Sequence, residues 1–216
     1  MDLQRIDTQR TYRELLELIT TLALPPGEPL NEQLLAGRLN TTVTAVQEAL
    51  KLLAHDGLVT VTARHGIYVA EANAADLAEL SELRLELEGL AARLAAQRAT
   101  ADDLAVLDAL CREQEAFARD EPQRLFDLDH RFHQAIAAAA HNRYLAKTLE
   151  QFFGLSRRLW FLALPRLGSL PGAVGVHVAL VEAIRARDAD RAERLMHAHV
   201  EGFYAEARAA LEEDRS

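Results

Sequence analysis

The chain has 216 residues, of which half are apolar and 26% are charged, and this composition excludes a disordered or fibrous protein. Its single cysteine, Cys111, excludes an intramolecular disulfide, and the N-terminal residues lack the apolar run of a signal peptide. Apolar stretches such as AIAAAA at 135–140 are far shorter than the ~20 residues that span a bilayer. We therefore expect a cytoplasmic protein that makes no contact with a membrane.

The charge balance restricts how the protein can bind nucleic acid. The formal net charge is −9, from 24 Lys and Arg against 33 Asp and Glu. Residues 1–72 hold six basic and nine acidic residues, so neither this region nor the rest of the chain is basic. Attraction of DNA by a broadly basic surface is excluded, and DNA binding would need a local site.

The first 72 residues combine short helical stretches with an alternating β-rich segment. The segment VTVTARHGIYVA at 59–70 has two alternating halves around a turn that ends in Gly66, which predicts a β-hairpin. Apolar periodicity and capping residues predict three helices before it: residues 10–22, a short helix after Asn31, and a helix from Thr41 or Thr42 to about Gly57. This order of elements predicts a winged helix-turn-helix.

From residue 73 onward the chain is rich in Ala, Leu, Arg and Glu at helical spacing. Thr100 and Asp103 form a capping box, and Pro122 suits the first position of a helix. The predicted helices are 76–99, one capped by Thr100, one from Pro122 to His141, one from Asn142 to about Pro165, 174–187, and one from Asp188 to about 212. We therefore expect a mainly α-helical protein with two domains, a winged helix-turn-helix at 1–72 and an antiparallel helical bundle at 73–216.

Histidines and one aspartate are placed on the predicted bundle helices in a way that indicates a metal site. Asp129 and His133 are four residues apart, so both side chains leave the same helical face. A buried Asp–His hydrogen bond without a metal would give the same pattern for this pair alone. His177 and His199, however, also lie within apolar stripes, where a solvated histidine is not expected. Four ligands from three helices can meet in the bundle core.

The predicted ligand set of three nitrogens and one oxygen suits a transition metal, with Zn²⁺ or Ni²⁺ preferred and Cu²⁺ or Fe²⁺ as alternatives. His197 is the main alternate to His199. His130 and His141 have no comparable pattern, and we expect His130 to be solvated.

Arg84 and Glu88 are also four residues apart, on an otherwise apolar helix. One interpretation is an ion pair on the helix surface, which would contribute roughly 0.3–0.5 kcal/mol. The other is that both residues face a cavity and bind an effector, because a guanidinium holds a carboxylate through two hydrogen bonds.

The chain resembles GntR-type bacterial transcription regulators of the FadR-like subgroup, which carry a C-terminal FCD effector domain. The resemblance rests on LPPGEPLNEQLLAGRL, AVQEALKLLAHDGLVTV and RHGIYV in the first domain, and on DLDHRFHQAIAAAAHN and HVALVEAIRARDADRAERLMHAHV in the second. It implies that Asp129, His133, His177 and His199 are metal ligands. It also implies a homodimer, a DNA operator as partner, and a small organic acid as effector near the metal.

The predicted recognition helix departs from the family pattern Ser-Arg-x-Pro-Val-Arg. This chain has Val43, Ala45 and Gln47 at the places of Arg, Pro and Arg, so two arginines that commonly contact DNA are missing. Gln47 can still read adenine, and hydroxyls can bind phosphates. The expected DNA-binding residues are Thr42, Thr44, Gln47, Lys51 and, in the wing, Arg64, His65 and Gly66.

The leading hypothesis is a dimeric, metal-containing, ligand-responsive transcription regulator that is not an enzyme. Because few cations face DNA, we expect weak operator affinity with a shallow salt dependence. The alternatives are a metal-dependent hydrolytic enzyme, a regulator-like protein that has lost specific DNA binding, and a metal-free bundle with a buried polar network.

Overall fold

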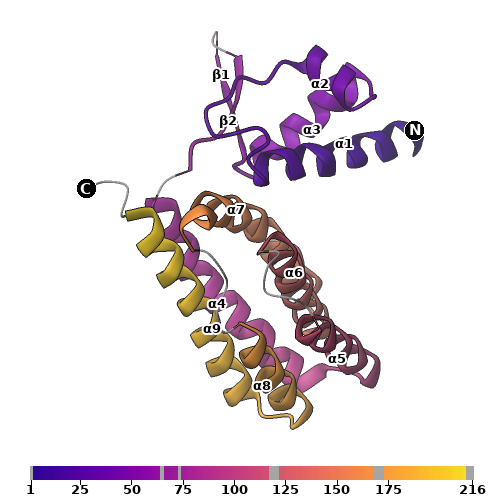
Figure 1. Ribbon diagram of the computed structural model, residues 1–216. Helices are drawn as coiled ribbons and strands as arrows, with labels where there is room; N and C mark the ends of the chain where they lie inside the picture. The colour runs from indigo at the N-terminus through magenta and orange to yellow at the C-terminus, as the bar shows by residue number, and fades with distance from the viewer. Residues whose placement is uncertain (1, 64–65, 73, 117–121, 168–172, 213–216) are drawn as a thin grey trace. The chain divides into compact units, whose positions relative to one another are not determined.

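The structure is a computed structural model that describes residues 2–63, 66–72, 74–116, 122–167 and 173–212. The chain forms two compact units (Figure 1). The first unit comprises residues 1–73 together with 154–162, and the second comprises 74–153 and 163–216. No helix in the described ranges is both long and apolar enough to cross a lipid bilayer.

The first unit contains the predicted winged helix-turn-helix. Asn31 accepts hydrogen bonds from the backbone of Gln33 and Leu34, and Thr42 accepts one from Ala45, so both predicted N-caps are present. The elements are α1 (Asp2–Thr20), α2 (Glu32–Arg38), α3 (Val43–His55), β1 (Val59–Thr62) and β2 (Gly66–Val69).

Apolar side chains at helical spacing hold these elements together. Leu15 and Ile19 of α1 and Val46, Leu50 and Leu53 of α3 are almost completely buried in one core. The two strands pair antiparallel, with Val59 opposite Val69 and Thr62 opposite Gly66.

Helix α1 is longer at its start than the prediction of 10–22, and it ends two residues earlier. The prediction relied on an apolar stripe, and Ile6 does not extend that stripe, because it is 60% exposed. Polar contacts are made there instead. Asp7 accepts hydrogen bonds from Arg10 and from Thr41, at 2.9 and 2.8 Å.

The second unit is an antiparallel helical bundle in which α4 and α9 run side by side, as Figure 1 shows. The small side chains of Ala91, Ala92, Ala95 and Ala96 are buried on α4. The helices are α4 (Ala74–Arg98), α5 (Ala101–Glu115), α6 (Pro122–Ala139), α7 (Arg143–Leu167), α8 (Ala173–Arg185) and α9 (Ala189–Glu212).

The local signals for these helices are confirmed. The capping box of Thr100 and Asp103 is formed, Pro122 is the first residue of α6, and Asn142 caps α7. Helix α7 continues two residues past Pro165, and most of the predicted break at 167–175 lies outside the described residues.

Helix α7 contributes to both units, because its residues 154–162 belong to the first. Within the first unit, the buried Arg158 donates hydrogen bonds to the carbonyls of Ala70 and Glu71, at 2.9 and 3.2 Å. Arg157 forms an ion pair with Glu17 of α1.

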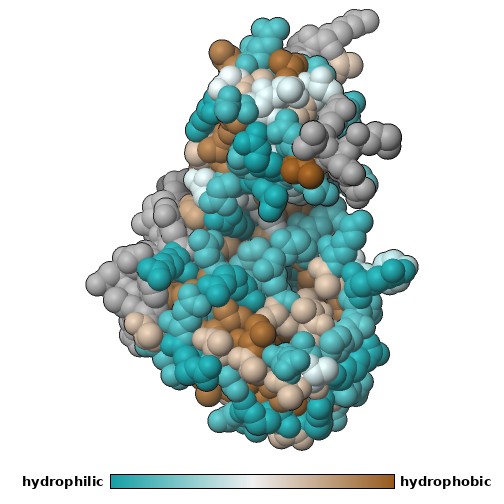
Figure 2. Space-filling model, turned by 90° about the vertical axis from the view of Figure 1, so that its right-hand side faces the viewer, coloured by the Kyte–Doolittle hydropathy of each residue, from teal (hydrophilic) through white to brown (hydrophobic). Residues whose placement is uncertain are grey.

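The surface view of Figure 2 is mostly hydrophilic, with an area of hydrophobic side chains in its lower half.

We expect Thr42→Ala to lower the free energy of unfolding by about 1 kcal/mol, because α3 loses its side-chain N-cap. Thr44→Ala, two residues on and exposed, is the control and should change it by less than about 0.5 kcal/mol. Urea unfolding followed by circular dichroism measures both. Equal stability of the two variants would contradict the capping role.

Candidate functional site

Four side chains that were predicted to bind a metal meet between three helices of the second unit. Asp129 and His133 lie one turn apart on α6, His177 lies on α8 and His199 lies on α9. One ligand atom from each residue lies within 4.8 Å of the other three. Nε2 of His199 is 3.0 Å from Nε2 of His133 and 3.3 Å from Nε2 of His177.

Burial and the neighbouring side chains set the charge state of this cluster. The ring of Phe132 stacks on His177 at a centroid distance of 3.9 Å. Burial lowers the pKa of His177 to about 4, so its imidazole is neutral at pH 7. Burial opposes ionisation of Asp129, but the charge of His133 and the imidazoles of His177 and His199 outweigh it and hold the pKa of Asp129 well below its usual range.

Two of the histidines are oriented by hydrogen-bond acceptors on the side of the ring that faces away from the cluster. Nδ1 of His133 contacts Oε2 of Glu88, and Nδ1 of His177 lies 2.8 Å from Oε1 of Gln114. Since these oxygens accept the Nδ1 hydrogen, a neutral imidazole at either position presents its Nε2 lone pair to the cluster. Carboxylate or amide acceptors behind the ligating histidines are a regular feature of metal sites.

An unsatisfied oxygen of Asp129 indicates that the cluster suits a cation. Oδ1 of Asp129 is buried and accepts no hydrogen bond from the described residues, although Nε2 of His177 and Nε2 of His199 lie 3.4 and 3.5 Å away. A buried carboxylate oxygen without a partner is costly unless a cation compensates it. Three imidazole nitrogens and a carboxylate oxygen form a donor set that fits a divalent transition metal.

The interpretation of Arg84 and Glu88 as an ion pair on the helix surface is wrong, because both side chains are buried. Both side chains are about 95% buried and form an ion pair, and Arg84 also donates to the Tyr204 hydroxyl at 3.4 Å. Burial opposes ionisation of Glu88, but the charges of Arg84 and His133 lower its pKa to about 2. The apolar residues around the pair on α4 indicated that it is buried, whereas the four-residue spacing of the two charges indicated an ion pair on the surface.

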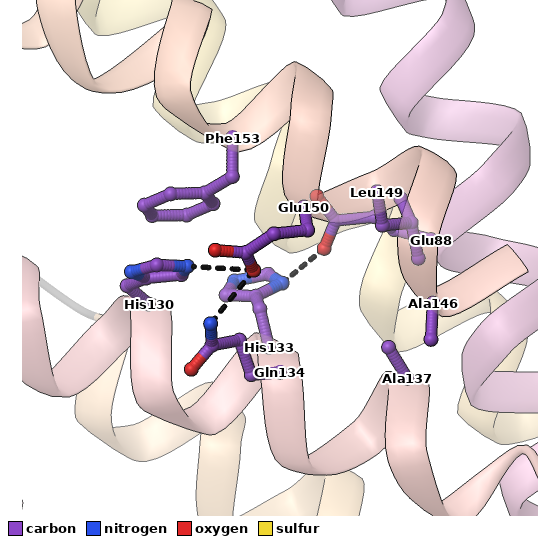
Figure 3. A pocket seen from close by; sticks show the side chains of 9 residues that line it. All are labelled: Glu88, His130, His133, Gln134, Ala137, Ala146, Leu149, Glu150 and Phe153. Carbon is purple, nitrogen blue, oxygen red and sulfur yellow. Dashed lines mark hydrogen bonds and ion pairs between the residues drawn. The ribbon is translucent and has the colours of Figure 1, made fainter. Parts of the chain in front are cut away.

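A cavity adjoins the cluster on the side of His133, between α4, α6 and α7 (Figure 3). Its volume is about 180 Å³, which is smaller than the roughly 300–1,000 Å³ of pockets for drug-sized ligands, so it suits a small molecule. Glu88 and His133 border it, whereas Arg84 borders a smaller space in front of Asp129 and His199. The remaining lining residues are His130, Gln134, Ala137, Ala146, Leu149, Glu150 and Phe153.

The other histidines of this unit have separate environments. His130 is partly buried rather than solvated: it stacks on Phe153 at 3.6 Å, and its Nε2 is 3.3 Å from Oε2 of Glu150. His197, the alternate ligand, packs against Gly89 of α4, where any side chain larger than hydrogen would collide with its ring. It is not part of the cluster.

The predicted DNA-binding residues of α3 differ in their surroundings: some are exposed, and others contact acidic side chains. Thr42 and Thr44 are exposed at the start of α3, and the Thr42 hydroxyl can still donate to a phosphate while it caps the helix. Gln47 donates to Oε2 of Glu32 at 3.0 Å, and Lys51 pairs with Glu48 at 2.7 Å.

In the wing, Gly66 is exposed and has φ of +107°, a conformation that favours glycine. Arg64 and His65 lie outside the described residues.

A winged helix-turn-helix followed by a helical bundle is the architecture of a DNA-binding transcription regulator. Residues 7–69 match the model of bacterial regulatory proteins of the gntR family, and residues 79–202 match the FCD domain. The chain therefore belongs to the GntR family of transcriptional regulators with an FCD domain. It is a regulator of transcription and not an enzyme.

Known relatives agree with this assignment. The chain is 32% identical to the Nta operon transcriptional regulator of Aminobacter aminovorans, over 83% of this chain and 84% of that protein. It is 28% identical to the HTH-type transcriptional repressor RspR of Escherichia coli, over 89% of this chain and 85% of that protein. The solved structure of E. coli McbR/YncC has the same fold, with a TM-score of 0.82, 23% identity, and coverage of 97% of this chain and 99% of that chain.

Sequence reasoning missed Gln114, Glu150 and Tyr204. Gln114 continues the buried stripe of Leu107 and Leu110 on α5, so a polar residue on an apolar stripe was the available signal. Glu150 and Tyr204 gave no such signal, because their partners lie on helices far away in the sequence.

We expect Glu88→Gln to lower the free energy of unfolding of the metal-free protein by about 3–5 kcal/mol, because it leaves the buried charge of Arg84 unpaired. The matched control is Glu113→Gln, which removes an exposed ion pair with Arg131 and should cost less than about 1 kcal/mol. Urea unfolding in the presence of a chelator compares them. A similar small effect for both variants would show that Glu88 does not compensate Arg84.

Proposed function

We propose that this protein is a metal-containing, effector-responsive regulator that binds its DNA operator as a homodimer. Asp129, His133, His177 and His199 hold one divalent ion, Zn²⁺ or Ni²⁺. The bound ion supplies a Lewis-acidic position where the carboxylate of a small organic acid binds. FCD domains are often metal-binding, which supports the first part of the proposal.

One observation carries the metal proposal. Three Nε2 atoms and a carboxylate oxygen face one another within 4.8 Å, and the Nδ1 atoms of His133 and His177 already face acceptors. Lone pairs brought this close repel one another unless a proton or a metal ion lies between them. Four protein ligands leave positions on a five- or six-coordinate ion for an effector.

The positions of Arg84 and Glu88 give them different roles in this proposal. Arg84 borders the space in front of Asp129, His133 and His199, where an effector carboxylate would approach the ion. Glu88 neutralises Arg84 and orients His133, so it is a positioning residue for the effector site.

Operator binding is assigned to α3 and the wing, with two copies of the unit on two half-sites. Relatives named as an operon regulator and as a repressor support a role at specific operators. One continuous helix, α7, links the effector cavity to this unit. Helix α7 carries Leu149, Glu150 and Phe153 of the cavity and, two turns further on, Arg158, which holds the backbone of Ala70 and Glu71.

We expect the purified protein to contain about one equivalent of zinc or nickel per chain, and His177→Ala and His199→Ala to contain less than about a tenth. His141→Ala is the control, because His141 is exposed and pairs with Asp103 away from the cluster. Elemental analysis after dialysis against each metal measures this. Wild-type protein that stays metal-free after addition of Zn²⁺ and Ni²⁺ would instead support a metal-free polar bundle.

We expect specific binding to genomic fragments selected by the protein, with a slope of log affinity against log salt much shallower than about −10. Lys51→Ala should reduce the magnitude of this slope by about 1, because it removes one phosphate contact. The control is Lys147→Ala, which changes the chain's only other lysine, an exposed residue of α7. Selection of no sequence above background would favour a regulator-like protein that has lost specific DNA binding.

A further inference from the structure

We propose that the cavity beside the cluster binds the ammonium group of a short aliphatic amino carboxylate, and that Glu150 is the residue that holds this group. This inference rests on the proposed function, since the carboxylate end of the ligand is assigned to the metal ion. The inference adds the group at the other end of the ligand, an ammonium, which a simple organic acid lacks.

The charge of the cavity wall favours a cation. Its nine lining residues include two carboxylates, Glu88 and Glu150, and neither lysine nor arginine. Glu88 is already compensated by Arg84 and His133, whereas the hydrogen-bond partners of Glu150 among the described residues are Gln134 and His130. A ligand anion in this cavity would lie near the carboxylate of Glu150, with no lysine or arginine among the lining residues to compensate it.

Glu150 is held in place and keeps one oxygen available. Its Oε2 accepts a hydrogen bond from Nε2 of Gln134 at 2.7 Å and lies 3.3 Å from Nε2 of His130, as Figure 3 shows. The ring of His130 is in turn fixed by stacking on Phe153 at an interplanar angle of 7°. Oε1 of Glu150 has no hydrogen-bond partner among the described residues, and the side chain is 51% exposed.

The rest of the wall selects an aliphatic body for the ligand. Ala137, Ala146 and Leu149 give the cavity an apolar surface with small side chains. His133 and Phe153 border both the cavity and the space in front of the cluster, so the two spaces are neighbours, and the proposed ligand would extend from one to the other. An ammonium ion against a carboxylate makes a charge-assisted hydrogen bond, which is stronger than a neutral one.

Calorimetric titration of the zinc-loaded full-length protein tests this. The probes are 4-aminobutyrate, 5-aminopentanoate, 6-aminohexanoate and 2-aminobutyrate, each compared with the carboxylate of equal length that lacks the amine, and with butylamine. We expect at least one amino carboxylate to bind about tenfold or more tightly than its amine-free counterpart. Glu150→Gln should abolish this difference by weakening binding of the amino carboxylate but not that of the amine-free acid, while the zinc content stays unchanged. The control Glu113→Gln, an exposed glutamate of α5, should preserve the difference.

Three outcomes would overturn the inference: equal or tighter binding of the amine-free acids, no binding by any amino carboxylate, or a preference for the amine that survives in Glu150→Gln. Failure of the proposed function is recognised separately. Absence of zinc, or operator binding that none of the bound probes changes, would refute the proposed metal-containing, effector-responsive function even where the amine preference is present. If butylamine binds as tightly as 4-aminobutyrate, Glu150 holds the amine but the metal does not hold the carboxylate.

Discussion

The compensation of buried charge inside a helical bundle is the constraint on which this structure depends. Burial of an ionised side chain costs several kcal/mol unless a partner of opposite charge or a full set of hydrogen bonds accompanies it. Here Arg84 is paired with Glu88, and Glu88 contacts His133, so one line of polar contacts leads from α4 to α6. This line ends at Asp129, whose buried Oδ1 has no hydrogen-bond partner in the described part of the chain, and a bound cation would complete it.

The same constraint explains why the ligand histidines are placed on stiff elements. His133 lies on α6, His177 on α8 and His199 on α9, and none lies in a loop. Aromatic packing against Phe132 and the acceptors Glu88 and Gln114 reduce the number of orientations open to the rings. A site prepared in this way loses little side-chain entropy when the ion binds.

Much of the second unit could be predicted from local patterns. The spacing of Asp129 and His133, and the position of His177 within an apolar stripe, depend only on helical periodicity, which the sequence displays directly. The role of Gln114 could not be predicted, because it depends on how α5 lies against α8. The first turns of α1 also gave no signal, since polar contacts of Asp7 take the place of an apolar stripe there. The sequence likewise did not reveal that Gln47 is engaged by Glu32, a contact that must be exchanged before Gln47 can read a base.

Anomalous diffraction from crystals of the native protein, recorded above and below the absorption edges of zinc and nickel, tests the central claim most directly. The account predicts one peak per chain, about 2.0–2.2 Å from Nε2 of His133, Nε2 of His177, Nε2 of His199 and a carboxylate oxygen of Asp129. A peak coordinated by other residues, or ordinary hydrogen bonds among the four side chains in metal-replete crystals, would contradict it.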